Sequence, residues 1–382
     1  MVSFSDFKYF YGFFYIFGQT PFYPFHVKNR IKSKILMFLP IVMLIANAVW
    51  CSVLFLNVEY QKIKARNTIL YIFIILRLTA FVPNLVVICE SLIRPYGVRT
   101  INQRLFFICN ALKIKLKTQF RLCAFKSECI RDFSVCFTII AITIIIRMNI
   151  LILYDLSTEI AIFSMQLYKT MAILHALFYT NLFKFILISM NEAILKNDCE
   201  SIVRSQVILD FDYGRSNRLS TLSLYRTRFI YLKLWEVVEM YNKQFGWSLI
   251  AIMLESMASA TNSFYGALIY FADSDNFIQQ TIRPICNFLS AVVSTTILIN
   301  ACHYCTIQKT ELIKNIEKLT FWAGDNEKLH FAKQELLSQI NNLDISISGK
   351  GFFIIDRQFL AGMAAACCTY IIIFIQFYLS GK

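Results

Sequence analysis

The chain has 382 residues, of which 57% are hydrophobic and only 16% are charged, and its formal net charge is +14. A soluble domain usually carries about 25% charged residues, so this composition excludes a purely soluble protein and predicts a large area within a membrane. The positive charge requires no nucleic acid partner, because basic residues on cytosolic faces beside anionic membrane lipid account for it.

The first segment, residues 1–34, is rich in aromatic side chains, with twelve of them in the first 25 positions. It has no early basic cluster, no aliphatic core and no small-residue cleavage site, so it does not resemble a signal peptide. An aromatic segment of this kind favours either a membrane interface or packing against the membrane helices. Both placements stay open, and both put the segment beside the helix bundle.

Seven apolar stretches are long enough to cross a bilayer, for which a helix needs about 20 residues. They are residues 35–58, 67–93, 133–154, 161–190, 246–272, 283–306 and 358–380. The remaining residues form loops, so no soluble domain of any size is left over. The predicted fold class is an all-α polytopic membrane protein with seven transmembrane helices.

The lysines and arginines predict the orientation of these helices, since basic residues favour cytosolic loops. Of the 38 basic residues, 29 lie in 1–34, 94–132, 191–245 and 307–357, and the segments on the opposite side hold five. This split places the N-terminus in the cytosol and the C-terminus outside the cell. A seven-helix receptor that signals through a G protein has the opposite orientation. A small-molecule transporter is the other alternative, but no internal repeat is visible.

Five charged residues lie inside the predicted spans, namely Arg77, Arg147, Lys169, Lys184 and Glu255. Charged groups are expensive in lipid, so these side chains are expected to face the bundle interior. One interpretation is structural pairing, for example of Glu255 with one of the cations. The other is contact with a ligand or an ion.

Small polar residues form two stripes on the fifth and sixth spans. One stripe contains Glu255, Ser259, Asn262 and Gly266, with Ser263 and Tyr265 alongside, and the other contains Asn287, Ser290 and Ser294. The spacing puts each stripe on one helix face. Such residues often only hold helices together. The alternative is an outward-open ligand pocket, for which we predict the lining residues Gln166, Tyr168, Asn262, Tyr265, Asn287 and Ser290.

The segment 307–357 has an amphipathic pattern that predicts cytosolic helices. Its apolar residues recur at helical spacing, with a "GDN" break at 324–326. They are Leu312, Ile316, Leu319, Leu329, Leu336, Leu337 and Ile340. Residues 221–245 are similarly amphipathic. We expect helices that run on from the membrane and pack together in the cytosol; the alternative is a solvated charged helix.

No enzyme signature is present in the chain. It has no glycine-rich phosphate loop, no serine nucleophile elbow and no HExxH motif, and its four histidines are scattered. The "CHYC" from Cys302 to Cys305 invites a metal interpretation, but no second ligand pair exists elsewhere, so membrane-embedded free thiols are the better interpretation. We expect no enzymatic activity, no metal and no cofactor.

The last predicted span carries the most specific motif. In "TYIIIFIQF", Thr369 and Gln376 are seven residues apart and share one helix face, and Tyr370 and Phe377 share the adjacent one. This pattern strongly resembles the signature of insect gustatory receptors, in which TY and QF flank five hydrophobic residues. The preceding "GKGFFIIDRQFLAGM" also looks like the segment that leads into the last helix of that family.

The resemblance implies a function. Insect gustatory receptors, like the related odorant receptors, are ligand-gated non-selective cation channels that assemble as tetramers around a pore lined by the last helix. The implied partners are a small-molecule tastant, the permeating cations, and further gustatory receptor subunits in a homo- or heterotetramer. The implied location is the plasma membrane of chemosensory neurons, and the implied ligand pocket lies in the outer half of the bundle.

The resemblance also implies roles for the motif residues. Gln376 and Phe377 are expected to line the gate near the outer mouth of the pore, and Thr369 and Tyr370 to couple the pore helix to its neighbours. Sugar receptors of the family typically carry an acidic residue directly after the TY pair, where this chain has Ile371. We therefore expect a bitter or other non-sugar contact chemical, with a pheromone equally open.

The predicted organisation has four parts. Residues 1–34 form a cytosolic N-terminal segment, and 35–306 contain transmembrane helices one to six with the ligand pocket. Residues 307–357 form a cytosolic helical anchor region, and 358–382 form the pore-lining seventh helix.

Overall fold

The computed structural model describes residues 95–116, 118, 120–150, 156–207, 213–273, 277–319 and 327–380, together with Phe7, Phe10, Phe14, Leu85, Val86, Cys89 and Glu90. The predicted first span and most of the second therefore lie outside the described residues. The side chains of some positions within the described helices, among them Tyr168 and Phe377, also lie outside this description.

Seven helices form the described part of the chain. They are α4 (Pro95–Leu116), α5 (Leu122–Ile150), α6 (Leu156–Val207), α7 (Tyr213–Asp273), α8 (Phe277–Lys318), α9 (Glu327–Asn342) and α10 (Arg357–Ser380). Extended backbone within these ranges is limited to one isolated antiparallel bridge, between Ser348 and Ile354. The predicted all-α fold class is confirmed.

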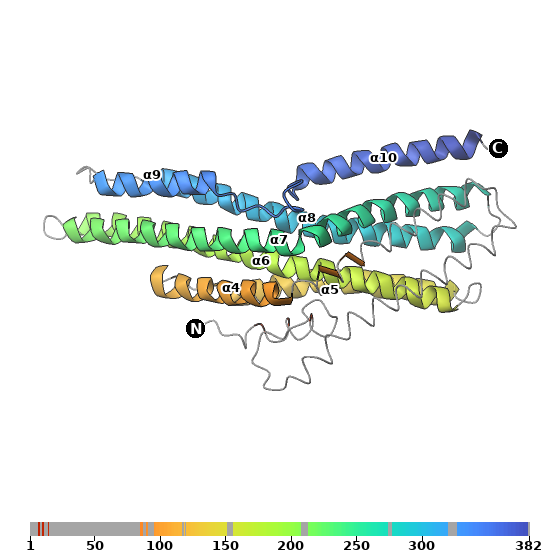
Figure 1. The fold of residues 1–382 in the computed structure, drawn as a ribbon, viewed down its shortest axis with the longest axis horizontal. Helices are drawn as coiled ribbons and strands as arrows, with labels where there is room; N and C mark the ends of the chain where they lie inside the picture. Colours follow the sequence, from red (N-terminus) through yellow and green to blue (C-terminus); the bar gives the residue numbers. More distant parts are fainter. Residues whose placement is uncertain are drawn as a thin grey trace, which may run out of the picture.

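The helices form an elongated bundle in which α6, α7 and α8 run through most of its length (Figure 1). The helices α4 and α9 flank these three at one end, and α5 and α10 flank them at the other. With 61 residues, α7 is about 90 Å long, roughly three times the thickness of the hydrocarbon layer of a bilayer. The long helices therefore extend well beyond any membrane that they cross, as the amphipathic pattern predicts.

Four described stretches are long and apolar enough to cross a membrane, namely Leu122–Ile146, Lys169–Lys196, Pro284–Lys318 and Arg357–Gln376. They overlap the predicted third, fourth, sixth and seventh spans. The first of them begins earlier than predicted, because α5 continues through the charged residues 128–132 without a break. The predicted fifth span, 246–272, lies within α7 but is not among the four, since Glu255 and several small polar residues lower its apolar character.

The helices of the segment 307–341 pack against the rest of the described chain rather than standing as solvated charged helices. Their cytosolic location stays a prediction. In α9, Leu329, Ala332, Leu336 and Ile340 are buried, as are Leu312 and Ile316 in α8. The helix α8 ends at Lys318 and α9 begins at Glu327, so the pattern divides into two helices as expected. Across the contact with α7, the Tyr231 hydroxyl donates to the Leu343 carbonyl at 2.7 Å, and Arg228 pairs with Glu335 at 2.5 Å.

Three phenylalanines of the aromatic N-terminal segment pack into the core between α5 and α6. Phe7 and Phe14 are fully buried, and Phe10 is partly buried. The Phe7 ring meets Phe125 of α5 edge to face at 5.6 Å and Phe178 of α6 at 6.2 Å between centroids. For these three residues, packing on the helices is therefore the correct one of the two predicted placements.

A tight turn connects α9 to α10. It is closed by the bridge between Ser348 and Ile354, and it places Lys350 at a φ of 53° and Gly351 at a φ of 80°. Glycine adopts this left-handed conformation without cost, whereas lysine pays of order 1 kcal/mol or more. The strain at Lys350 therefore has to be offset by contacts that hold the turn in place.

Candidate functional site

The predicted pocket residues lie at one end of the bundle. Only three residues separate the end of α7 from the start of α8, so Asn262 and Tyr265 near the end of α7 lie at the same end as Asn287 and Ser290 near the start of α8. The start of α6 and the C-terminal end of α10 lie at this end too (Figure 1). The two polar stripes therefore lie at similar depth, as the sequence predicts.

Two of the predicted ligand residues contact each other directly. The Gln166 amide of α6 donates to the Asn287 carbonyl oxygen of α8 at 3.2 Å, and both side chains are half-buried. The side chain of Asn262 is also half-buried, and the Ser290 carbonyl accepts a hydrogen bond from the Ser294 hydroxyl at 2.7 Å. Tyr168 lies in α6 with its side chain outside the described residues. The contact between Gln166 and Asn287 joins two helices at the level of the stripes.

An ion pair lies one helical turn further into the bundle. Lys169 of α6 pairs with Glu255 of α7, and their side chains are only 13% and 12% exposed. The structure thus supports the interpretation that Glu255 pairs with a membrane-embedded cation. Arg77 and the side chain of Arg147 lie outside the described residues.

Buried hydroxyl groups without a partner mark this region as well, and sequence reasoning missed them. Some helical threonines here donate to the carbonyl four residues back, as Thr170 and Thr261 do. The hydroxyls of Ser256, Thr281 and Thr295 are buried but have no hydrogen-bond partner within the described part of the chain. A buried polar atom of this kind calls for a water, an ion or a ligand. No sequence signal separates these three from their satisfied neighbours.

The contact between α7 and α10 is made by residues that the motif does not single out. The Tyr265 ring packs against Phe374 of α10 at 5.4 Å between centroids, and the Cys367 thiol donates to the Met257 carbonyl at 3.7 Å. Thr369 is exposed and donates to the Ala365 carbonyl of its own helix, and Tyr370 is 48% exposed. Within one chain, Phe374 and Cys367 therefore link α10 to the predicted pocket.

The helix α10 is the least covered of the four apolar stretches. Asp356 starts it by accepting the Phe359 backbone N–H at 2.8 Å, an N-cap contact. None of the residues in its most apolar window is buried within the chain. Gln376 is exposed near its C-terminal end, and Phe377 is helical with its side chain outside the described residues. Such a helix needs lipid, further subunits or both to cover it.

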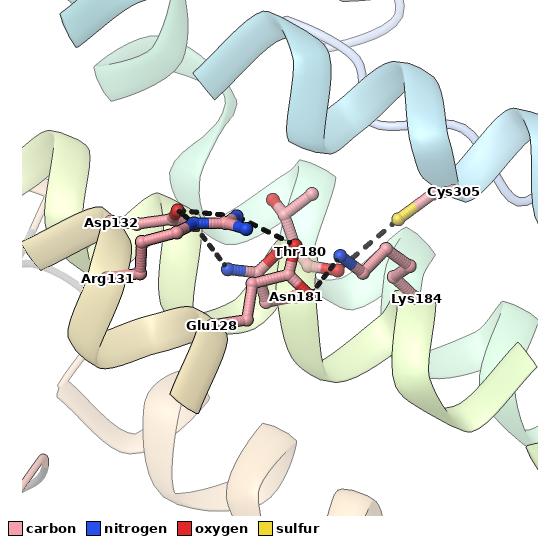
Figure 2. A network of polar contacts seen from close by, with 7 residues as sticks. All are labelled: Glu128, Arg131, Asp132, Thr180, Asn181, Lys184 and Cys305. Carbon is pink, nitrogen blue, oxygen red and sulfur yellow. Dashed lines mark hydrogen bonds and ion pairs between the residues drawn. The ribbon is translucent and has the colours of Figure 1, made fainter. Parts of the chain in front are cut away.

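A second polar cluster joins α5 to α6 (Figure 2). Lys184, with a side chain only 8% exposed, pairs with Glu128 at 2.6 Å. Asp132 accepts from Arg131 at 2.9 Å and from the Asn181 amide at 3.1 Å. Two acidic and two basic side chains balance one another here, so the cluster pairs its charges internally and fixes α5 against α6.

The cysteines of "CHYC" lie beside this cluster. Cys302 and Cys305 are both buried free thiols. The Cys305 thiol donates to the Thr180 carbonyl at 3.3 Å, and Cys302 lies 4.0 Å from the Thr180 hydroxyl (Figure 2 shows Cys305 and Thr180). Both thiols therefore serve the packing of α8 on α6.

The described helices form an all-helical fold with four stretches that are long and apolar enough to cross a membrane. The sequence matches the 7tm chemosensory receptor family over residues 7–381, and the chain belongs to that family.

Relatives and solved structures agree with this membership. "Putative gustatory receptor 98c" of Drosophila melanogaster is 23% identical over 168 residues, which are 44% of this chain and 41% of that protein. The match thus spans about two fifths of the relative's length. The fold is similar to that of the insect olfactory receptor OR5 from Machilis hrabei, with a TM-score of 0.68 and 13% identity over 97% of both chains. The same receptor in complex with eugenol gives a TM-score of 0.65 and 13% identity, over 97% of this chain and 98% of that one.

Proposed function

We propose that the chain is a gustatory receptor that acts as a ligand-gated non-selective cation channel in the plasma membrane of chemosensory neurons. Membership of the chemosensory receptor family supports the receptor role. The observation that carries the channel role is α10, a helix of membrane-spanning length whose most apolar window has no buried residue in the described structure.

A tetramer with α10 at its axis accounts for this exposure. One side of α10 rests on α7 through Cys367 and Phe374, and Arg357 at its start bonds to Asn300 of α8. The remaining surface is available for a pore, for neighbouring subunits and for lipid. At the axis, four copies of Gln376 offer amides to water and cations, and rings of Phe377 close the pore by excluding water. The exposed positions of Thr369 and Tyr370 suit contacts with neighbouring subunits, through which they couple the pore helix to its surroundings.

The ligand is a small molecule that binds at the outer end of α6, α7 and α8. The hydroxyls of Ser256 and Thr281 are buried and have no hydrogen-bond partner among the described residues, which supports this placement because a ligand can satisfy them. The olfactory receptor that shares the fold has been solved with eugenol, a small organic molecule. The residues Gln166, Tyr168, Asn262, Tyr265, Asn287 and Ser290 provide the contacts. Ile371 in place of an acidic residue favours a bitter or other non-sugar contact chemical.

The four-part organisation belongs to this proposal. The N-terminal segment 1–34 and the anchor region 307–357 are cytosolic, the pocket lies within 35–306, and 358–382 form the pore helix. The anchor holds subunits together, as a homotetramer or with other gustatory receptor subunits. The chain is a receptor channel with no catalytic role. The basic residues gather on the segments assigned to the cytosol, an arrangement opposite to that of receptors that signal through G proteins.

The test is electrical recording from cells that express the chain. A panel of quinine, caffeine, denatonium and sucrose is screened by calcium imaging, and active compounds are then applied to excised membrane patches without nucleotides. We expect cation currents that persist in excised patches and that a non-sugar compound evokes. Responses in intact cells that vanish in patches and require GTP would instead establish a receptor coupled to a G protein.

A further inference from the structure

A buried carboxylate reaches the backbone in the middle of α7. Glu90, which is 9% exposed, accepts the backbone N–H of Trp247 at 3.3 Å and that of Ser248 at 2.9 Å, and also the Ser248 hydroxyl at 2.6 Å. Interior N–H groups of a helix ordinarily bond to the carbonyl four residues earlier. A side chain that competes for them is a feature of helix starts and of kinks.

The carbonyl to which the Trp247 N–H would bond within the helix also has a charged partner. The carbonyl four residues before Trp247 belongs to Lys243, and it accepts a hydrogen bond from Lys350 Nζ at 2.5 Å. The Trp247 N–H therefore has the negatively charged Glu90 as a partner outside the helix, and the Lys243 C=O has the positively charged Lys350. When this helical hydrogen bond lengthens or opens, both groups keep a hydrogen-bond partner, so bending at this point costs little.

Lys350 belongs to the strained turn that precedes α10, and this turn is fixed on the same part of α7. A Cβ on Gly246 would lie 2.6 Å from the Lys350 backbone nitrogen, so helix and turn are in direct backbone contact. The Asn242 side chain donates to the Ser346 carbonyl at 2.9 Å and accepts the Ser348 N–H at 3.1 Å. These contacts hold Lys350 at its positive φ of 53°.

The location of this contact separates two parts of α7. The part that precedes it contacts α4 through Arg226 and α9 through Arg228, and the part that follows it carries Asn262 and Tyr265. In Figure 1, α7 changes direction near its middle, close to the point where α10 begins. A change of bend here would move the outer part of α7 and the turn that leads into α10 together.

We propose that Glu90 and Lys350 are a positioning pair that holds a hinge in α7 and ties its bending to the start of α10. Glu90 holds the N–H side of the hinge, and Lys350 holds the carbonyl side while anchoring the turn. The consequence for gating rests on the proposed channel function, whereas the hinge itself does not.

Amide hydrogen exchange on the purified full chain tests the hinge directly. Glu90→Gln keeps the shape of the side chain but weakens its hydrogen bonds, and exchange at the Trp247 and Ser248 amides should become about tenfold faster. The matched control is Glu236→Gln. Glu236 lies earlier on α7 and pairs with Arg104 of α4 and with Lys233 of its own helix. This substitution should leave the exchange of this segment unchanged. Unaltered exchange in a folded Glu90→Gln protein would overturn the hinge.

Basal current per receptor at the cell surface tests the link to gating. Glu90→Gln and Lys350→Met should each change agonist-free current about fivefold or more, and the double variant should deviate from the product of the two changes. Lys350→Arg, which keeps the positive charge, should give the same agonist-free current as the wild type. A wild-type chain without any current, but with the expected exchange, would refute the channel function and leave the hinge standing. If the chain conducts but its basal current is unchanged in all of these variants, the coupling between the hinge and α10 is overturned.

Discussion

The largely buried ion pair of Lys169 and Glu255 offers a prediction that is independent of ligand and pore. We expect Lys169→Met and Glu255→Met to destabilise the protein strongly as single variants and to be nearly neutral together. Each single variant leaves one charge between helices without its partner. The double variant removes both charges and fills similar volume with apolar atoms.

The magnitude follows from the burial of the two side chains. Exposed pairs contribute about 0–1 kcal/mol, but these side chains are only 13% and 12% exposed, so solvent screens them little. Breaking a buried pair costs roughly 3–5 kcal/mol, whereas replacing both partners is often neutral. At about 2 °C per kcal/mol for a large domain, each single variant should lower the apparent melting temperature by about 5 °C or more.

Thermal unfolding of the purified chain in detergent, followed by size-exclusion chromatography, measures these shifts. The matched control is the exposed pair of Glu239 and Lys243 on α7, separated by 3.6 Å. The same single and double substitutions there should give an interaction free energy of less than about 1 kcal/mol. Additive losses at Lys169 and Glu255, with a double variant as unstable as the sum of the singles, would refute the reasoning that these charges stabilise each other.

Three further predictions follow from the same structure. Phe377→Ala should raise the current without agonist, measured by whole-cell recording, because smaller side chains let water into the closed pore; wild-type leak would argue against a gate there. Asn287→Ala should shift the half-maximal concentration of an active tastant roughly fivefold or more through a lost hydrogen bond, whereas an unchanged dose–response curve would leave this residue with a packing role. Partial burial raises the pKa of Asp344, but hydrogen bonds from Lys309 and Ser346 outweigh it, so the pKa of Asp344 is lowered. Its stabilising contribution is therefore present above the unfolded pKa of about 3.9 and is lost as pH falls through the folded value. Asp344→Asn should flatten the acid side of the melting-temperature profile, and an identical profile would contradict this assignment.

Much of the fold could be predicted from hydrophobic spacing. Leu312, Ile316, Leu336 and Ile340 repeat at helical intervals, and all four are buried. The ends of the membrane helices could not be predicted, because α6, α7 and α8 continue through the interface as single helices. A change from apolar to amphipathic composition marks a change of solvent, and it does not interrupt a helix.

The candidate site was only partly accessible to sequence reasoning. The expected pocket lining included both Gln166 and Asn287, and they form a hydrogen bond in the structure. The buried hydroxyls of Ser256 and Thr281, which lack a partner in the part of the chain that the structure describes, could not be identified from sequence, because the hydrogen bonds of a hydroxyl depend on its tertiary neighbours. Phe374, which packs on Tyr265, was hidden within an apolar run where every residue suits lipid.

The central claim is that α10 lines a cation pore with Gln376 facing the permeating ions. Single-channel recording of the wild type and of Gln376→Ala, with external sodium exchanged for potassium or caesium, tests it most directly. The account predicts that the substitution changes unitary conductance or relative cation permeability more than it changes the agonist concentration for half activation. Unitary currents with wild-type conductance and selectivity, from a Gln376→Ala receptor that reaches the membrane, would contradict the assignment of α10 as the pore helix.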